Sequence, residues 1–190
     1  MSGVRHARQA LALDDERRTF HPNVWHRDPR PGAAASDDAL ETLEQVWFAG
    51  AHSNVGGGYP KDGLAYVTLD WMMGELEHLY RGDIALLGGA RRQVREAANS
   101  FDRLYDPRKG PAALYRYSPR RPVWFHEGVD DIYDRFFKTP AAEPPSDGIA
   151  IHASVWDRVE RGSQAYAPLF LPTTARVVHT KGPGSAPDAL

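Results

Sequence analysis

The sequence predicts an α/β fold with few parallel strands, flanking helices and long proline-rich loops. One basis for this prediction is a strand expected over residues 43–51, where the apolar residues from Val46 to Ala51 are nearly continuous, as is typical of a strand buried on both faces of a parallel sheet. Another is the helical spacing of apolar residues over 63–80, which follows a loop containing Gly56, Gly57 and Gly58. Strand, glycine loop and helix therefore make up the centre of the predicted fold.

The composition is typical of one folded domain with a net charge close to zero. Of the 190 residues, 42% are hydrophobic, which is enough for one core. The formal net charge of -2 provides no basic field, so we expect no nucleic-acid partner. The absence of cysteine excludes disulfides, thiolate zinc sites and a cysteine nucleophile.

The N-terminal residues predict a short amphipathic helix over 4–20, because apolar and charged side chains are mixed there. We interpret the acidic run Asp14, Asp15 and Glu16, followed by Arg17 and Arg18, as the solvated end of this helix. A flexible linker is predicted over 27–42. The chain shows neither the apolar core of a signal peptide nor a transmembrane segment, so we expect it to be cytoplasmic as synthesised.

The C-terminal half predicts further helices between proline-rich loops. One helix is predicted over 91–104, and an amphipathic helix is predicted over 149–161 with Gly162 at its C-terminal end. Residues 129–137 are helical or extended, and 139–148 form a link. The domain is expected to span 1–172, and the last residues, 173–190, to form a disordered tail.

His52 is the candidate functional residue because it follows the buried strand directly. Ligands of open α/β sheets meet the loops at the carboxyl ends of strands. Its imidazole could take a proton from a serine hydroxyl and return it to a leaving group. Gly56, Gly57 and Gly58 would let the backbone turn sharply beside it. The alternative interpretation is a strand that ends at the surface and a turn before a helix.

The sequence contains no obvious partner for His52. It has no Gly-x-Ser-x-Gly elbow, no Gly-x-Gly-x-x-Gly and no phosphate-binding Gly-Lys-Ser/Thr. Ser53 is adjacent to His52, so we expect its side chain to point elsewhere. A single Glu75-x-x-His78 is half of what a di-metal bundle site needs, so we expect no metal and no cofactor.

Four segments in order resemble the uncharacterised α/β-hydrolase domain family that includes type VI secretion phospholipase effectors: residues 10–20, 46–59, 69–72 and 151–155. The resemblance implies a partial α/β-hydrolase-like fold, the C-terminal portion of that domain, with His52 as the triad histidine. It also implies that the serine nucleophile and the acid lie upstream of Met1. Ser53, Asn54 and the three glycines would shape the loop, although the family pattern usually has aspartate where Asn54 stands.

The resulting functional hypothesis is a fragment of a serine ester hydrolase that supplies the histidine and is inactive alone. Its partner would be a separate N-terminal hydrolase chain or a second copy, and its substrate a lipid or ester once the enzyme is complete. The resemblance also implies export as, or with, an effector. One alternative is a noncatalytic protein-interaction module, and another is a hydrolase that draws its nucleophile, Ser53 or Ser154, from this chain.

Overall fold

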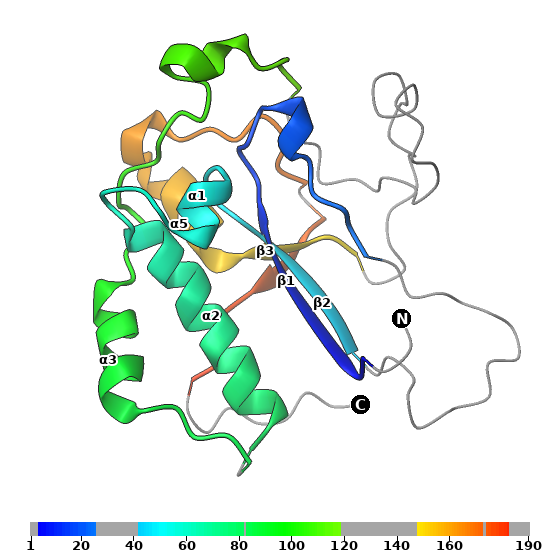
Figure 1. Ribbon diagram of the computed structural model, residues 1–190, viewed down its shortest axis with the longest axis vertical. Helices are drawn as coiled ribbons and strands as arrows, with labels where there is room; N and C mark the ends of the chain where they lie inside the picture. The colour runs from blue at the N-terminus through cyan, green and yellow to red at the C-terminus, as the bar shows by residue number, and fades with distance from the viewer. Residues whose placement is uncertain (1–3, 26–41, 82, 119–147, 173, 183–190) are drawn as a thin grey trace, which may run out of the picture.

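The fold is a parallel sheet with helices on both faces, which confirms the predicted α/β class (Figure 1). The structure, a computed structural model, describes residues 4–25, 42–81, 83–118, 148–172 and 174–182. Within these residues one four-stranded sheet has the order β1-β2-β3-β4. Its strands are β1 (His6–Ala12), β2 (Thr42–Phe48), β3 (Ala150–His152) and β4 (Arg176–Val178), all paired in parallel.

The helix predicted over 4–20 is wrong, because residues 6–12 form β1. Successive side chains of a strand point to opposite faces of the sheet. Ala10 and Ala12 accordingly pack with the cluster around Trp71, whereas Leu11 and Leu13 pack with the cluster around Trp47. The apolar residues of this segment therefore serve two core layers with a period of two, rather than one face of a helix.

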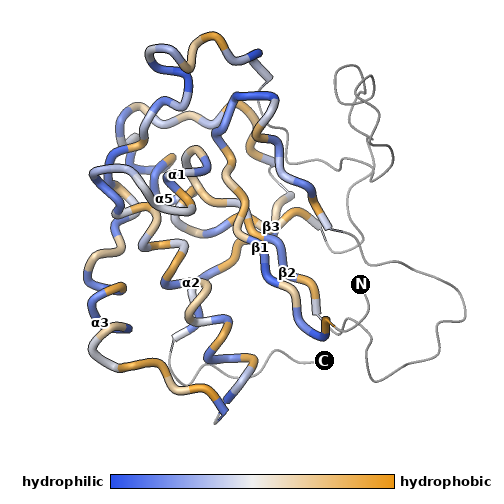
Figure 2. Tube along the Cα trace, in the orientation of Figure 1, coloured by the Kyte–Doolittle hydropathy of each residue, from blue (hydrophilic) through white to orange (hydrophobic). Residues whose placement is uncertain are grey.

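Each face of the sheet carries its own apolar cluster. On one face, Val55 and Trp71 from the helices α1 (His52–Gly56) and α2 (Gly63–Leu79) pack on Phe48 of β2. On the other face, Val155 of α5 (Ala153–Arg161) packs on Trp47 and on neighbouring strand residues. The sheet is thus the middle of three layers. Figure 2 shows hydrophobic and hydrophilic segments alternating along α2, as expected for a helix with one buried side.

The helix predicted over 63–80 is confirmed as α2. The helix predicted over 91–104 is confirmed in part, since α3 spans Gly88–Ala97 and packs beside α2 (Figure 1). The single helix predicted over 149–161 is instead β3 followed by α5, and Gly162 ends α5 with a φ of 60°. Three short 3-10 turns complete the described elements: Arg18–Phe20, Gly110–Leu114 and Ser163–Ala165.

The tail predicted over 173–190 is wrong for residues 176–178, which form β4 and extend the sheet. Residues 183–190, the linker predicted over 27–42 except for its last residue, and the segments 129–137 and 139–147 lie outside the described residues. No helix in the described part of the chain is long and apolar enough to cross a membrane.

Candidate active site

The site lies where the carboxyl ends of β1 and β2 meet. The parallel pairing of these strands continues past their ends, because Leu13 N donates to Phe48 O at 2.9 Å and Asp14 N donates to Gly50 O at 3.0 Å. The residues that follow the two strands are therefore brought side by side. Asp15 comes from the β1 end and His52 from the β2 end.

Asp15 and His52 are hydrogen-bonded, with His52 Nδ1 and Asp15 Oδ2 2.7 Å apart. The Asp15 carboxylate is fully buried, whereas 44% of the His52 side chain is exposed. An ionised carboxylate can only accept, so a bond that the ring donates to Asp15 places the hydrogen on Nδ1 and leaves Nε2 as the basic nitrogen. The backbone N–H of His52 donates to the same carboxylate oxygen at 3.4 Å. This is the arrangement in which a carboxylate fixes the tautomer of a catalytic histidine.

The resemblance implies an acid upstream of Met1, but the carboxylate at His52 comes from Asp15, within the chain. The expectation that Asp14, Asp15 and Glu16 form a solvated helix end is also wrong, since Asp15 is buried. One signal in the sequence could have found it. Once residues 6–12 are recognised as a strand parallel to β2, an acid just after β1 must lie beside a histidine just after β2.

Asp14 connects three parts of the chain next to this pair. Its Oδ2 accepts from Gly50 N at 2.6 Å and from the Tyr166 hydroxyl at 2.8 Å. Burial raises the pKa of Asp14 to about 6, against the lowering effect of these bonds and of Arg158. The loop that carries His52 is thus tied to the loop after β1 and to the C-terminal segment.

Ser53 does not point away from His52 as expected. Its Oγ lies 3.0 Å from His52 Nε2, at the position where a nucleophilic hydroxyl would sit. The surroundings do not favour it as the nucleophile. The N–H groups of Asn54 and Val55, the nearest candidates for oxyanion donors, already bond to Ala51 O at 2.8 and 3.1 Å inside α1.

Asn54 anchors α1 to the segment 103–105. Its side chain is buried, its Nδ2 donates to Arg103 O at 3.2 Å, and its Oδ1 accepts from Ala51 N at 3.3 Å and Tyr105 N at 3.4 Å. An aspartate could not make the first of these bonds. Asn54 therefore keeps the hydrogen-bonded turn on which His52 sits.

The predicted glycine turn is present, although its first residue belongs to α1. Gly57 and Gly58 have φ of 89° and 110°, values that L side chains rarely adopt, and the chain turns there from α1 toward α2. Gly56 and Gly57 line a groove that also contains His52.

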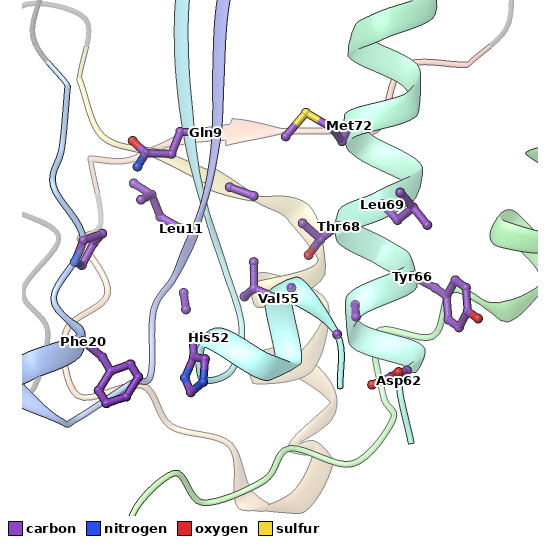
Figure 3. Close-up of a pocket in the computed structure, with 16 residues that line it drawn as sticks. Gln9, Leu11, Phe20, His52, Val55, Asp62, Tyr66, Thr68, Leu69 and Met72 are labelled. Atoms are coloured by element: carbon purple, nitrogen blue, oxygen red, sulfur yellow. The ribbon is translucent and has the colours of Figure 1, made fainter. Parts of the chain in front are cut away.

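This groove has a volume of about 590 Å³ and lies between β1, α1 and α2. Four consecutive residues of β1, Gln9 to Ala12, line it, so it follows the outer edge of the strand rather than one face of the sheet. Figure 3 shows His52 and Phe20 at one end and Met72 and Gln9 toward the other, with Thr68 directed inward from α2. The buried Thr68 Oγ1 has no hydrogen-bond partner among the described residues, and neither has Gln9 Oε1.

Ser154 belongs to a different, buried arrangement. Its Oγ and His152 Nδ1 are 2.9 Å apart, and the His152 ring accepts from Ser154 N at the start of α5. Burial lowers the pKa of His152 to about 4, so the ring is neutral near pH 7. This pair caps a helix, and the structure does not bring it together with His52.

Residues 1–75 match a protein-family model described as "T6SS, Phospholipase effector Tle1-like, catalytic domain". The match includes β1, β2, α1 and most of α2, and therefore both His52 and Asp15. This part of the chain is similar to a phospholipase effector of the type VI secretion system, in agreement with the predicted α/β-hydrolase-like fold. No curated protein matches the chain, and no solved structure does.

Proposed function

We propose that this protein supplies the histidine and the acid of a serine ester hydrolase of the phospholipase-effector type. The observation that carries the proposal is the 2.7 Å hydrogen bond between exposed His52 and fully buried Asp15 at adjacent strand ends. In this proposal Nε2 takes the proton of a serine hydroxyl and passes it to the leaving alcohol. Asp15 holds the imidazole and stabilises its protonated form.

The serine itself is proposed to lie outside these 190 residues, because this sequence has no strand-to-helix elbow with a serine. The groove along β1 supports this assignment. Among the described residues β2 is the only strand that pairs with β1. Arg5 O and Leu13 N bond to β2, so by alternation the peptide groups of Arg8 and Ala10 are directed away from it, toward the groove side. A strand added there would end beside His52.

A second candidate is a hydrolase that uses Ser53, and the 3.0 Å contact with His52 Nε2 favours it. The occupied N–H groups of Asn54 and Val55 weigh against it. In the preferred proposal Ser53 only donates a hydrogen bond to Nε2 until the true nucleophile replaces it. The two candidates differ in what removal of the Ser53 hydroxyl should do.

The test is ester and phospholipid turnover by the purified chain, alone and mixed with a separately expressed polypeptide that carries the serine-bearing part of such a hydrolase domain. We expect turnover only in the mixture, its loss in His52→Ala, and its persistence in Ser53→Ala. Turnover by the chain alone that disappears in Ser53→Ala would support the second candidate. A folded, monodisperse chain that is inactive in both conditions would contradict both and favour a noncatalytic interaction module.

A further inference from the structure

Arg17 contacts both members of the proposed pair, although neither the motif comparison nor the family match gives it a role. Its Nε donates to Asp15 Oδ1 at 3.1 Å and its Nη2 donates to Asp15 Oδ2 at 3.0 Å. The backbone N–H of Arg17 adds a third bond to Oδ1 at 3.2 Å. The guanidinium is itself almost fully buried. Such a two-pronged contact fixes the plane of a carboxylate as well as its charge.

The same guanidinium approaches the imidazole, with Arg17 Nη2 2.7 Å from His52 Nδ1. Both nitrogens also lie within hydrogen-bond distance of Asp15 Oδ2. Arginine can only donate, so a bond between the two nitrogens would require Nδ1 without its hydrogen. The buried carboxylate then would lose its bond from the ring. The charge-assisted bonds to Asp15 are the stronger alternative, with both donors converging on one oxygen.

We propose that Arg17 is a positioning residue for His52: its guanidinium orients Asp15 to accept the Nδ1 hydrogen, and its charge opposes that of the carboxylate, so that Nε2 serves as the proton acceptor. The inference rests on the proposed function for its purpose, but not for its test. A buried carboxylate alone beside an imidazole would favour the charged ring, which is no longer a base. A cation at the same carboxylate opposes that preference.

The position of Arg17 is itself held by aromatic groups. The guanidinium carbon lies 3.7 Å from the ring centroid of Phe20 and 5.5 Å from that of Tyr115, and the Phe20 ring stacks on His52 at 4.9 Å. The hydrogen bond to Asp15 is the largest of the causes that raise the pKa of Arg17. Other ionisable groups that act electrostatically on Arg17, Asp15 or the neighbouring Glu16 are Tyr59, Tyr115, Asp106 and Arg108.

The test is an NMR titration of the His52 ring in the whole chain, with the signal assigned by its loss in His52→Gln. In Arg17→Gln the titration midpoint should rise by about one pH unit or more, because a cation next to the imidazolium is gone. Arg17→Lys keeps the charge and should restore most of the shift. Arg18→Gln removes the neighbouring positive charge and serves as the matched control, with a midpoint close to that of the wild type. An unchanged or lower midpoint in folded Arg17→Gln would overturn the proposal.

A second measurement needs no variant and covers the case in which Arg17→Gln does not fold. Long-range proton–nitrogen correlation spectra of the wild-type ring report which nitrogen carries the hydrogen. We expect hydrogen on Nδ1 and none on Nε2 above the midpoint. Hydrogen on Nε2 would mean that Nδ1 accepts from Arg17, and would overturn the proposal. Because neither readout involves turnover, an inactive mixture with the expected spectra would refute the proposed function alone.

Discussion

At the scale of single residues, His52 is held by contacts that an alignment of motifs does not show. The side chain of Asn54, two residues after His52, is buried and forms hydrogen bonds with Ala51 and with the segment 103–105. Its amide donates where an aspartate would place an oxygen against the carbonyl of Arg103. The residue that departs from the family pattern is therefore matched to its surroundings in this chain.

Asn54→Asp should lower the free energy of unfolding by about 1–3 kcal/mol, because a buried carbonyl loses its donor and a charge is buried. Denaturant unfolding at pH 7 measures the change. Ser53→Ala, the neighbouring substitution at a less buried side chain, is the control and should stay within about 0.5 kcal/mol of the wild type. An Asn54→Asp variant as stable as the control would show that the Arg103 contact contributes nothing.

Asp14 should make stability depend on pH in a defined direction. Its pKa is about 6 in the folded protein, against an ordinary value of 3.8 for an aspartate. Between these values the folded state binds more protons than the unfolded state, so this group's contribution to stability falls as pH rises from 3.8 to about 6. The difference between these two pKa values corresponds to a change of about 3 kcal/mol in the free energy of unfolding.

Asp14→Asn removes this titration while its amide oxygen can still accept from Gly50 and Tyr166, which both bond to the same oxygen. Unfolding free energies measured from pH 4 to pH 8 should therefore show the wild type losing stability relative to Asp14→Asn as pH rises to about 6. A difference between the two proteins that does not vary with pH would refute the assignment.

At the scale of elements, the junction between β2 and α1 depends on Gly50. Its φ is 105°, and a Cβ there would lie 2.4 Å from the Asn54 Cβ. No small adjustment relieves this contact, because Asn54 belongs to α1 and is itself anchored. Gly50 therefore permits the sharp turn that places His52 beside Asp15.

Gly50→Ala should destabilise the protein by roughly 2 kcal/mol or more and perturb the His52 ring signals, since strain and overlap act together. Gly58→Ala is the matched control, because Gly58 also has a positive φ, 110°, but a Cβ there meets nothing within 4 Å. Gly58→Ala should therefore lower the free energy of unfolding by less than Gly50→Ala does. Thermal unfolding of both variants measures the difference, and equal costs would show that the overlap with Asn54 is irrelevant.

The elements that sequence analysis predicted are those with one dominant period. β2 ends in an uninterrupted apolar and buried segment, residues 46–48, and α2 is long with a buried side, so both were predicted near their observed bounds. β1 was missed because its alternation is interrupted by polar residues such as Arg8, which pairs with buried Glu75 at 2.7 Å. β3 was merged into α5 because three residues are too few to show a period.

The site was predicted in part for the same reason. His52 and the glycine turn were identified because they follow a strand that was recognised. Asp15 and Arg17 were predicted to be solvated because they stand in a run of charged residues. The sequence alone does not show that Asp15 is paired with Arg17 and with the distant His52. Only the parallel register of β1 and β2 brings them to His52.

At the scale of the whole molecule, β1 is an edge strand of the sheet within the described part of the chain, and it lies beside the proposed site. If a second polypeptide adds a strand there, the amides of Arg8 and Ala10 should exchange with solvent more slowly in the mixture. Those of Ala7 and Leu11, which face β2, should change less. Hydrogen exchange followed by NMR measures this, and unchanged rates at Arg8 and Ala10 in an active mixture would place the partner elsewhere.

The central claim is that Asp15 is the acid that serves His52, and the turnover of Asp15→Asn in the active mixture tests it most directly. Asparagine keeps the shape but loses the charge that fixes the ring tautomer, so kcat should fall by about 10³-fold or more. Circular dichroism and binding of the second polypeptide would confirm that the variant is folded and assembled. Turnover of folded Asp15→Asn within tenfold of the wild type, in a mixture that still requires His52, would contradict the claim.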